Sequence, residues 1–308
     1  MKTTIYSVIL LGLTLFAMTG CSTDPDINKA DHESRALAVE SFLADIAQNV
    51  AGDRIKVDSL MPLELDPHAF EPAPADVAKI SQTKILIVNG AGLEGWLQEV
   101  LDNAGGERLL IVASEGLTSR RVEKNPSSEA DHEGDPHFWL DPSKVIRYIE
   151  NIRDGFIRYD PAGKSAYTQN ASRYLQELKD LDAWIKEQVQ EIPPERRLLV
   201  TNHESLGYFA DRYGFEVVGT IIPSTSTGAS PSAKQVADLV NKIRSAGAPA
   251  IFLETGANPK LDELIAREAG VKIVIDIYTH SLSSPGGKAP TYLEMMRYNT
   301  QVICDSLK

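Results

Sequence analysis

The sequence predicts an α/β protein with two similar lobes, each built on a parallel sheet, joined by one long helix. Short β-branched runs alternate with amphipathic segments in both halves of the chain, a pattern typical of βαβ units. Between the halves, apolar residues keep a helical period. A chain of 308 residues also exceeds what one hydrophobic core normally organises. We therefore expect lobes at residues 36–160 and 193–308, with a connecting helix at 161–192.

Residues 1–20 are typical of a secretory signal peptide. Lys2 supplies the positive end, and the apolar run at 5–16 is too short to span a bilayer. The small residue directly before Cys21 favours a lipobox, in which the mature N-terminal cysteine is acylated and anchors the chain to a membrane. The alternative is an ordinary cysteine near a processing site. Residues 21–35 then form a polar tether.

The expected elements follow one another in strand–helix order. In the first half they are strands at 36–39, 55–60, 85–88 and 109–112 and helices at 42–50, 74–81, 93–103 and 143–159. The connecting helix, at about 45 Å, outruns a domain core and ends at a Pro-Pro pair. In the second half they are strands at 198–201, 217–221, 250–253 and 272–275 and helices at 205–213, 232–246, 259–269 and 291–307.

The composition argues against some classes of partner. The chain has 43 acidic and 31 basic side chains and a formal net charge of −12. This balance argues against nucleic acid or an anionic membrane surface and mildly favours a cationic ligand. Cys304 is the only cysteine besides Cys21. If Cys21 carries lipid, no disulfide joins the two, and stability must come from core packing.

Four of the six histidines follow predicted strands, two in each half: His68, His137, His203 and His280. Ligands of open α/β sheets bind beyond the carboxyl ends of the strands. Each histidine alone could be incidental, but four at the same topological place predict one site between the lobes. His68 and His137 each stand in an Asp-Pro-His turn that holds them stiffly.

Neutral imidazoles converging from two lobes suit a borderline metal such as zinc. Four protein ligands leave no open position, an arrangement for holding a metal rather than using it in catalysis. The sequence has no His-Glu-x-x-His helix, Gly-rich phosphate loop or Ser/His/Asp ordering. We interpret Asp66, Asp135 and Asp141 as turn formers and helix caps, one of which could orient a ligating imidazole. Because each ligand must be neutral, affinity should fall as pH drops through about 6 to 7.

Six segments spanning nearly the whole mature chain carry a more specific signal: FLADI at 42–46, DPHAFEPAPAD at 66–76, VNGAGLE at 88–94, DPHFWLDP at 135–142, GYFADRYG at 207–214 and YLEMMRYN at 292–299. They resemble the metal-binding family of ABC-transporter solute-binding lipoproteins, the zinc and manganese receptors. The resemblance implies two Rossmann-like lobes bridged by a long helix, with the metal between them. It also implies that His68 and His137 are ligands from the first lobe. His203 stands where zinc-type members have histidine and manganese-type members glutamate, and Glu204 should point elsewhere.

The fourth ligand place departs from the family pattern. Members usually have a carboxylate before Ser-Leu, whereas this chain has Tyr278-Thr279-His280. We expect His280 to be the fourth ligand, with Asp276 and Glu254 as the nearest candidates for a replacement carboxylate. Since a four-imidazole site carries no compensating negative charge, it should reject manganese, which prefers oxygen ligands. It should admit zinc, with copper(II) or nickel as competitors.

Together these features predict an extracytoplasmic receptor, lipid-anchored at the cell surface or in the periplasm, that captures zinc and delivers it to an ABC permease in the cytoplasmic membrane. We expect a monomer without catalytic activity. One alternative is a three-histidine zinc hydrolase with Glu204 as base; others are a copper, nickel or manganese receptor of the same family, or an adhesin with a structural metal. The acidic loop at 127–134, with His132, is expected to be solvated.

Overall fold

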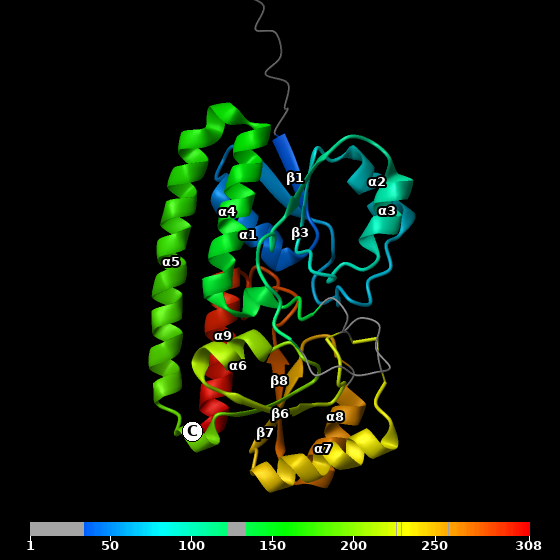
Figure 1. The fold of residues 1–308 in the computed structure, drawn as a ribbon, viewed down its shortest axis with the longest axis vertical. Coiled ribbons are helices and arrows are strands. Elements are labelled where there is room, and N and C mark those ends of the chain that lie inside the picture. The colour runs from blue at the N-terminus through cyan, green and yellow to red at the C-terminus, as the bar shows by residue number, and fades with distance from the viewer. Residues whose placement is uncertain (1–33, 122–133, 226, 229, 258) are drawn as a thin grey trace, which may run out of the picture. The chain divides into compact units, whose positions relative to one another are not determined.

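Two four-stranded parallel sheets, one in each half of the chain, form the framework of the molecule (Figure 1). The computed structural model describes residues 34–121, 134–225, 227–228, 230–257 and 259–308. The expected signal peptide, Cys21 and His132 lie outside the described residues. The predicted fold class, two α/β lobes joined by a long helix, is confirmed.

The first sheet has the strand order β2-β1-β3-β4, with every pair parallel. Side chains alternate across a strand, so β3 contributes to a core on each face of the sheet. Ile85 and Ile87 pack with α1 and α4, and Leu86 and Val88 pack with α2 and α3. The strands are β1 (Ser34–Ala38), β2 (Ile55–Ser59), β3 (Ile85–Val88) and β4 (Leu109–Val112), and the helices α1 (Ser41–Ala51), α2 (Pro74–Gln82), α3 (Leu97–Ala104) and α4 (Pro142–Tyr159).

Helix α5 (Lys164–Gln190) connects the halves and runs for 27 residues, about 40 Å. Its buried residues recur every three or four positions and so lie on one face: Tyr167, Ala171, Tyr174, Leu178, Leu181, Ile185 and Val189. This face packs on α4 and α1 of the first half and on α9 of the second. Pro193 and Pro194 follow the end of the helix.

The second sheet, β6-β5-β7-β8, repeats the strand order of the first. Helices α7 and α8 pack together over a separate core, whereas α6 and α9 join the large core that also holds α1, α4 and α5. The strands are β5 (Leu198–Thr201), β6 (Glu216–Thr220), β7 (Ala250–Glu254) and β8 (Lys272–Ile277), and the helices α6 (Gly207–Tyr213), α7 (Ala233–Ala246), α8 (Pro259–Ala269) and α9 (Tyr292–Leu307).

Contacts between the halves are direct. The Tyr292 hydroxyl on α9 donates to the Trp139 carbonyl at 2.6 Å, and the Trp139 indole donates to the Thr279 carbonyl at 2.6 Å. The Tyr292 amide donates to the Asp45 carboxylate on α1 at 2.9 Å. Because all four residues are buried or half-buried, these contacts join the two lobes away from solvent.

One predicted helix begins later than expected. The sequence predicts a helix from 93, but α3 begins at Leu97, because residues 91–96 form turns in which the Leu93 and Leu97 amides donate to the carbonyls three residues earlier. The Glu94 carboxylate accepts from the Asn89 and Gly90 amides at 2.5 and 3.0 Å, which holds this segment as a turn.

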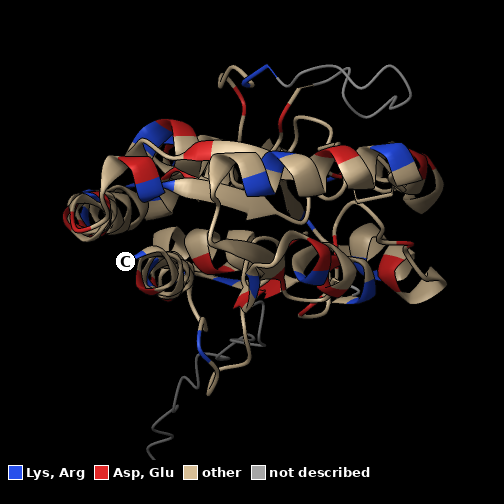
Figure 2. Cartoon of the chain, turned by 90° about the horizontal axis from the view of Figure 1, so that it is seen from below, with Lys and Arg blue, Asp and Glu red and all other residues tan. Residues whose placement is uncertain are grey.

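Acidic and basic residues are spread along the helices of the molecule, with both signs interspersed (Figure 2). This distribution is typical of solvated surfaces. Within the described part of the chain, no helix combines the length and apolar character needed to cross a bilayer.

Candidate metal centre

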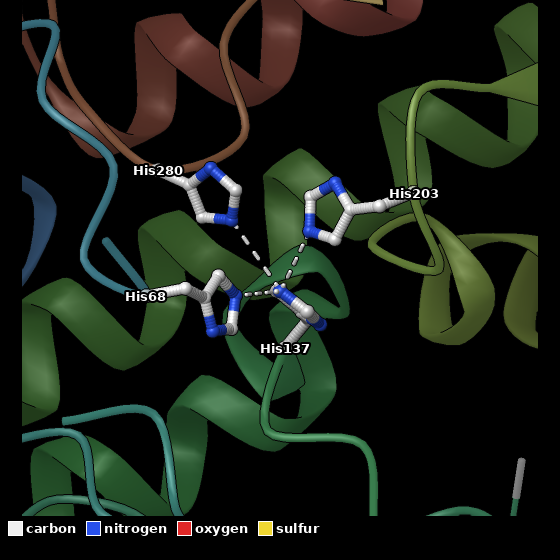
Figure 3. A group of neighbouring side chains, drawn as sticks. All are labelled: His68, His137, His203 and His280. Carbon is white, nitrogen blue, oxygen red and sulfur yellow. Dashed lines mark hydrogen bonds between the residues drawn. The ribbon is translucent and has the colours of Figure 1, made fainter. Parts of the chain in front are cut away.

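The structure brings the four predicted histidines to one point between the lobes (Figure 3). The His137 Nε2 atom lies 3.1 Å from His68 Nε2, 3.2 Å from His203 Nε2 and 3.4 Å from His280 Nε2. His137 and His203 are fully buried, and His280 is 8% exposed. Each side chain follows a strand, as the sequence predicts: β2, β4, β5 and β8 in chain order.

Hydrogen bonding alone cannot satisfy this arrangement. An imidazole nitrogen carries either one hydrogen or one lone pair, so His137 Nε2 can make one good hydrogen bond, yet three imidazole nitrogens point at it. Buried polar atoms that cannot pair with one another are costly. A cation that accepts all four lone pairs removes this cost, and the residues therefore fit a metal ion.

Asp135 holds the ring of His137 from behind. The Asp135 Oδ1 atom lies 2.8 Å from His137 Nδ1 and also accepts from the His137 amide at 3.0 Å. A carboxylate that takes the Nδ1 hydrogen fixes the tautomer whose Nε2 lone pair faces the centre. The interpretation of Asp135 as a turn former is therefore correct, and the same side chain also orients the imidazole.

Glu254, at the end of β7, stands behind both histidines of the second lobe. Its Oε1 atom lies 2.9 Å from His203 Nδ1, close but not aligned as a hydrogen bond, and its Oε2 atom lies 3.6 Å from His280 Nδ1. The hydroxyls of Ser205 and Thr279 donate to the two oxygens at 2.9 and 2.6 Å. The carboxylate is 5% exposed and held ionised in this position.

These carboxylates correct one expectation. The sequence analysis expected a site with no compensating negative charge, but Asp135 and Glu254 supply it from behind the rings. The other candidate, Asp276, pairs with Lys288 at 2.8 Å and is not part of the cluster. Glu204 likewise contributes no atom to the group of potential ligands.

The two remaining aspartates act as turn and cap residues. Asp66 accepts from the His68 amide at 2.9 Å, and its other oxygen takes the hydroxyl of Thr227. Asp141 caps α4 by accepting from the Ser143 amide at 2.8 Å. The predicted local roles of both aspartates are confirmed.

The electrostatics divide the four imidazoles into two kinds. Burial and the neighbouring imidazoles lower the pKa of His68 to about 3 and of His280 to about 4, and they hold the pKa of His137 well below its ordinary value. For His203, burial acts in the same direction, but the carboxylates of Glu254, Asp66 and Asp135 together outweigh it and raise the pKa. Burial opposes ionisation of Glu254, yet His203 lowers its pKa. Of the four imidazoles, His203 is therefore the one that holds a proton to the highest pH when no metal is bound.

A cavity of about 520 Å³ adjoins the cluster on the side of His280. Asp66, Glu254 and Asp262 line it together with a single ammonium group, that of Lys260. Its lining is net negative, which favours cations over anions beside the imidazoles.

Two parallel-sheet lobes bridged by a long helix, with inward-facing imidazoles between them, are the architecture of a two-lobed receptor that holds a metal ion. The profile described as ZnuA, zinc-uptake complex component A, periplasmic, matches residues 37–306. The chain belongs to this family of metal-binding solute-binding lipoproteins of ABC transporters. The family consists of binding components of extracytoplasmic metal transport systems.

Curated relatives match along the full chain. The manganese-binding lipoprotein MntA of Halalkalibacterium halodurans is 33% identical over 308 residues, covering 100% of this chain and 99% of the relative. The manganese ABC transporter substrate-binding lipoprotein PsaA of Streptococcus pneumoniae is 30% identical, with 98% of each chain covered.

Solved structures of similar fold include receptors named for different metals. The periplasmic zinc binding protein TroA of Treponema pallidum is 27% identical with a TM-score of 0.81, covering 89% of this chain and 99% of that one. The Mn-bound S38A mutant of a periplasmic metal binding protein from Candidatus Liberibacter asiaticus is 29% identical with a TM-score of 0.79, covering 89% and 100%.

Proposed function

We propose that the protein is a zinc receptor that holds the ion with the Nε2 atoms of His68, His137, His203 and His280 and delivers it to an ABC permease. The observation that carries the proposal is the convergence of three imidazole nitrogens on His137 Nε2. Four bonds of ~2.0–2.1 Å in a tetrahedron separate the ligand atoms by about 3.3–3.4 Å. The three separations from His137 Nε2, 3.1 to 3.4 Å, match this value, and all four ligand atoms lie within 4.8 Å of one another, which supports an ion of that size.

Manganese is the second candidate, because relatives such as MntA and PsaA are named for it. Manganese prefers carboxylate, carbonyl and water ligands, whereas imidazole suits zinc. The carboxylates Asp135 and Glu254 lie on the Nδ1 side of the rings, so each reaches the centre through an imidazole. The ligand chemistry of the cluster therefore favours zinc over manganese.

Competitive titration of the mature protein with zinc, manganese and copper(II) chlorides tests the choice of metal. We expect zinc to bind at least tenfold more tightly than manganese. His280→Ala should weaken zinc binding, and unchanged affinity would place the fourth ligand elsewhere. His132→Ala, outside the described residues, is the matched control and should leave affinity unchanged.

A three-histidine hydrolase would need an open position on the metal for water. We propose that His280 fills this position, since its Nε2 faces the same centre as the other three. Cobalt substitution tests the difference: a spectrum that changes when exogenous anions replace a water ligand would favour the enzyme. An adhesin with a structural metal predicts unfolding on chelation, whereas a transport receptor should release and rebind zinc while folded.

We further propose that Cys21 carries the lipid that anchors the receptor outside the cytoplasmic membrane. This assignment is supported by relatives that are named as lipoproteins and match this chain over nearly their full length. Expression with radiolabelled palmitate should label the wild-type chain and not Cys21→Ser. Labelling of both would refute the assignment.

A further inference from the structure

Arg120 crosses from the first lobe to α6 of the second. It follows β4, and its Nε atom lies 3.1 Å from Asp211 Oδ2 on α6. Its Nη1 atom lies 3.3 Å from Asp135 Oδ2 in the first lobe. The guanidinium therefore spans two carboxylates, one from each lobe, while its side chain is 22% exposed.

The same carboxylate of Asp135 holds the metal-site imidazole. One oxygen faces Arg120 and the other lies 2.8 Å from His137 Nδ1, and the side chain is fully buried. Tyr208 of α6 completes the contact: its hydroxyl accepts from the Arg120 amide at 2.9 Å and donates to the Asp135 carbonyl at 2.8 Å. Arg120 and His137 therefore contact the same carboxylate, that of Asp135, from its two oxygens.

Gly207, the first residue of α6, leaves the space that the guanidinium occupies. A Cβ atom there would lie 2.0 Å from Arg120 Nη1 and 2.5 Å from its Cζ. Such separations are far below van der Waals contact, so any side chain at 207 would push the guanidinium away. The position of the Arg120 guanidinium beside α6 therefore requires glycine at position 207.

We propose that Arg120 is a positioning residue that ties α6 to Asp135, keeps His137 aimed at the metal, and so sets how long the ion stays bound. This inference rests on the proposed metal-receptor function. Arginine suits the role because its planar fork can serve two carboxylates at once, whereas a lysine ammonium is a single point on a flexible stem. When the lobes separate, the contact with Asp211 is lost, and Asp135 loses part of its support.

Stopped-flow measurement of zinc dissociation into excess chelator tests the proposal, with intrinsic fluorescence as signal because the Trp139 ring lies 5.2 Å from the His137 ring. Arg120→Met should accelerate dissociation about 10- to 100-fold, the usual effect of losing a group that supports a metal ligand. Arg120→Lys keeps the charge without the fork and should recover only part of the loss. The association rate should change less than threefold.

Gly207→Ala separates positioning from folding. Alanine is the better helix former and leaves Arg120 in the chain, so any loss of metal-free Tm should be smaller than in Arg120→Met, while the displaced guanidinium should speed zinc release as that variant does. Arg173→Met is the control, since that arginine pairs with Glu177 at 3.9 Å on the exposed side of α5.

Dissociation rates within twofold of wild type for both Arg120→Met and Gly207→Ala would overturn the proposal. An equal loss of Tm by Arg120→Met with and without zinc would also overturn it, because that result means a purely structural role. If wild type holds no zinc, the proposed zinc function fails. The same variants tested with manganese chloride then measure whether Arg120 positions His137.

Discussion

Replacing Glu254 by glutamine should change how zinc binding depends on pH. The glutamine amide keeps the shape of the side chain and removes the charge 2.9 Å from His203 Nδ1. At an effective dielectric constant of about 20, two unit charges at that distance attract by about 6 kcal/mol, equivalent to roughly four pKa units. Glu254 contributes more than any other group to raising the pKa of His203 against burial, so the variant should lower that pKa.

The number of protons released on zinc binding measures this change. Wild type should release protons from His203, whose pKa Glu254 raises, and from Asp135, whose pKa burial raises to about 7. The other imidazoles, His68 and His280 among them, are already neutral. The expectation that all four ligands titrate near pH 6 to 7 is thus replaced by one that involves mainly His203. Glu254→Gln should release measurably fewer protons than wild type.

The affinity for zinc should also depend on pH through this proton. A site that must lose a proton binds more weakly as pH falls below the pKa of that group, about tenfold per pH unit per proton. At pH 8 the variant should bind zinc about 10- to 100-fold more weakly than wild type, because the carboxylate supporting two imidazoles is gone. At pH 6 the difference should narrow, since wild type then competes with a proton on His203 and the variant does not.

Isothermal titration calorimetry in buffers of different ionisation enthalpy gives the proton count directly. Glu187→Gln, which removes the same charge from an exposed position of α5, should match wild type. Equal proton release by wild type and Glu254→Gln at pH 7 would refute the assignment of the proton to His203.

Three further predictions follow from other contacts. His280→Asp gives the metal an oxygen ligand and should raise manganese affinity relative to zinc at least tenfold in competition titration; an unchanged ratio would contradict the role of His280 in selectivity. Gly155→Ala places a Cβ 2.3 Å from Ile111 Cδ1 and should cost about 1–3 kcal/mol in urea unfolding, whereas Gly95→Ala, with no atom within 4 Å, should not. In excess chelator, Tm should decrease as the pH is lowered from 7.5 to 4.5. The pKa values of His68 and His280 are about 3 and 4 in the folded state, whereas an imidazole of the unfolded chain has a pKa of about 6.5. The unfolded state therefore binds more protons in this range, and lowering the pH favours it. The double variant His68→Gln/His280→Gln should lessen that fall, and an unaltered pH profile would argue against it.

The order of the elements could be predicted because each strand is a short apolar run and each helix has its own period. The four histidines could be assigned for a related reason: parallel strands present their carboxyl ends at one edge, so residues far apart in sequence meet there. The predicted start of α3 was wrong by four residues because residues 91–96 form turns, and apolar periodicity does not report which carbonyl each backbone amide bonds.

The supporting groups of the site were less accessible to sequence reasoning. Glu254 was a candidate by proximity to His280, but its position behind two rings depends on where β7 and β8 end. No sequence pattern indicates that Arg120 supports the histidine cluster. Its contacts with Tyr208 and Asp211 join residues 88 and 91 positions apart, and no local pattern marks such a pair.

The continuous helix α5 has a consequence for the entropy of capture. A rod of 27 residues packed against both halves permits small rotations and little else. The two pairs of imidazoles therefore arrive already near their final separation, and most of the ordering that a metal site requires is completed when the chain folds. For the proposed receptor, an ion that reaches the centre would therefore lose less of its binding free energy to the ordering of its ligands.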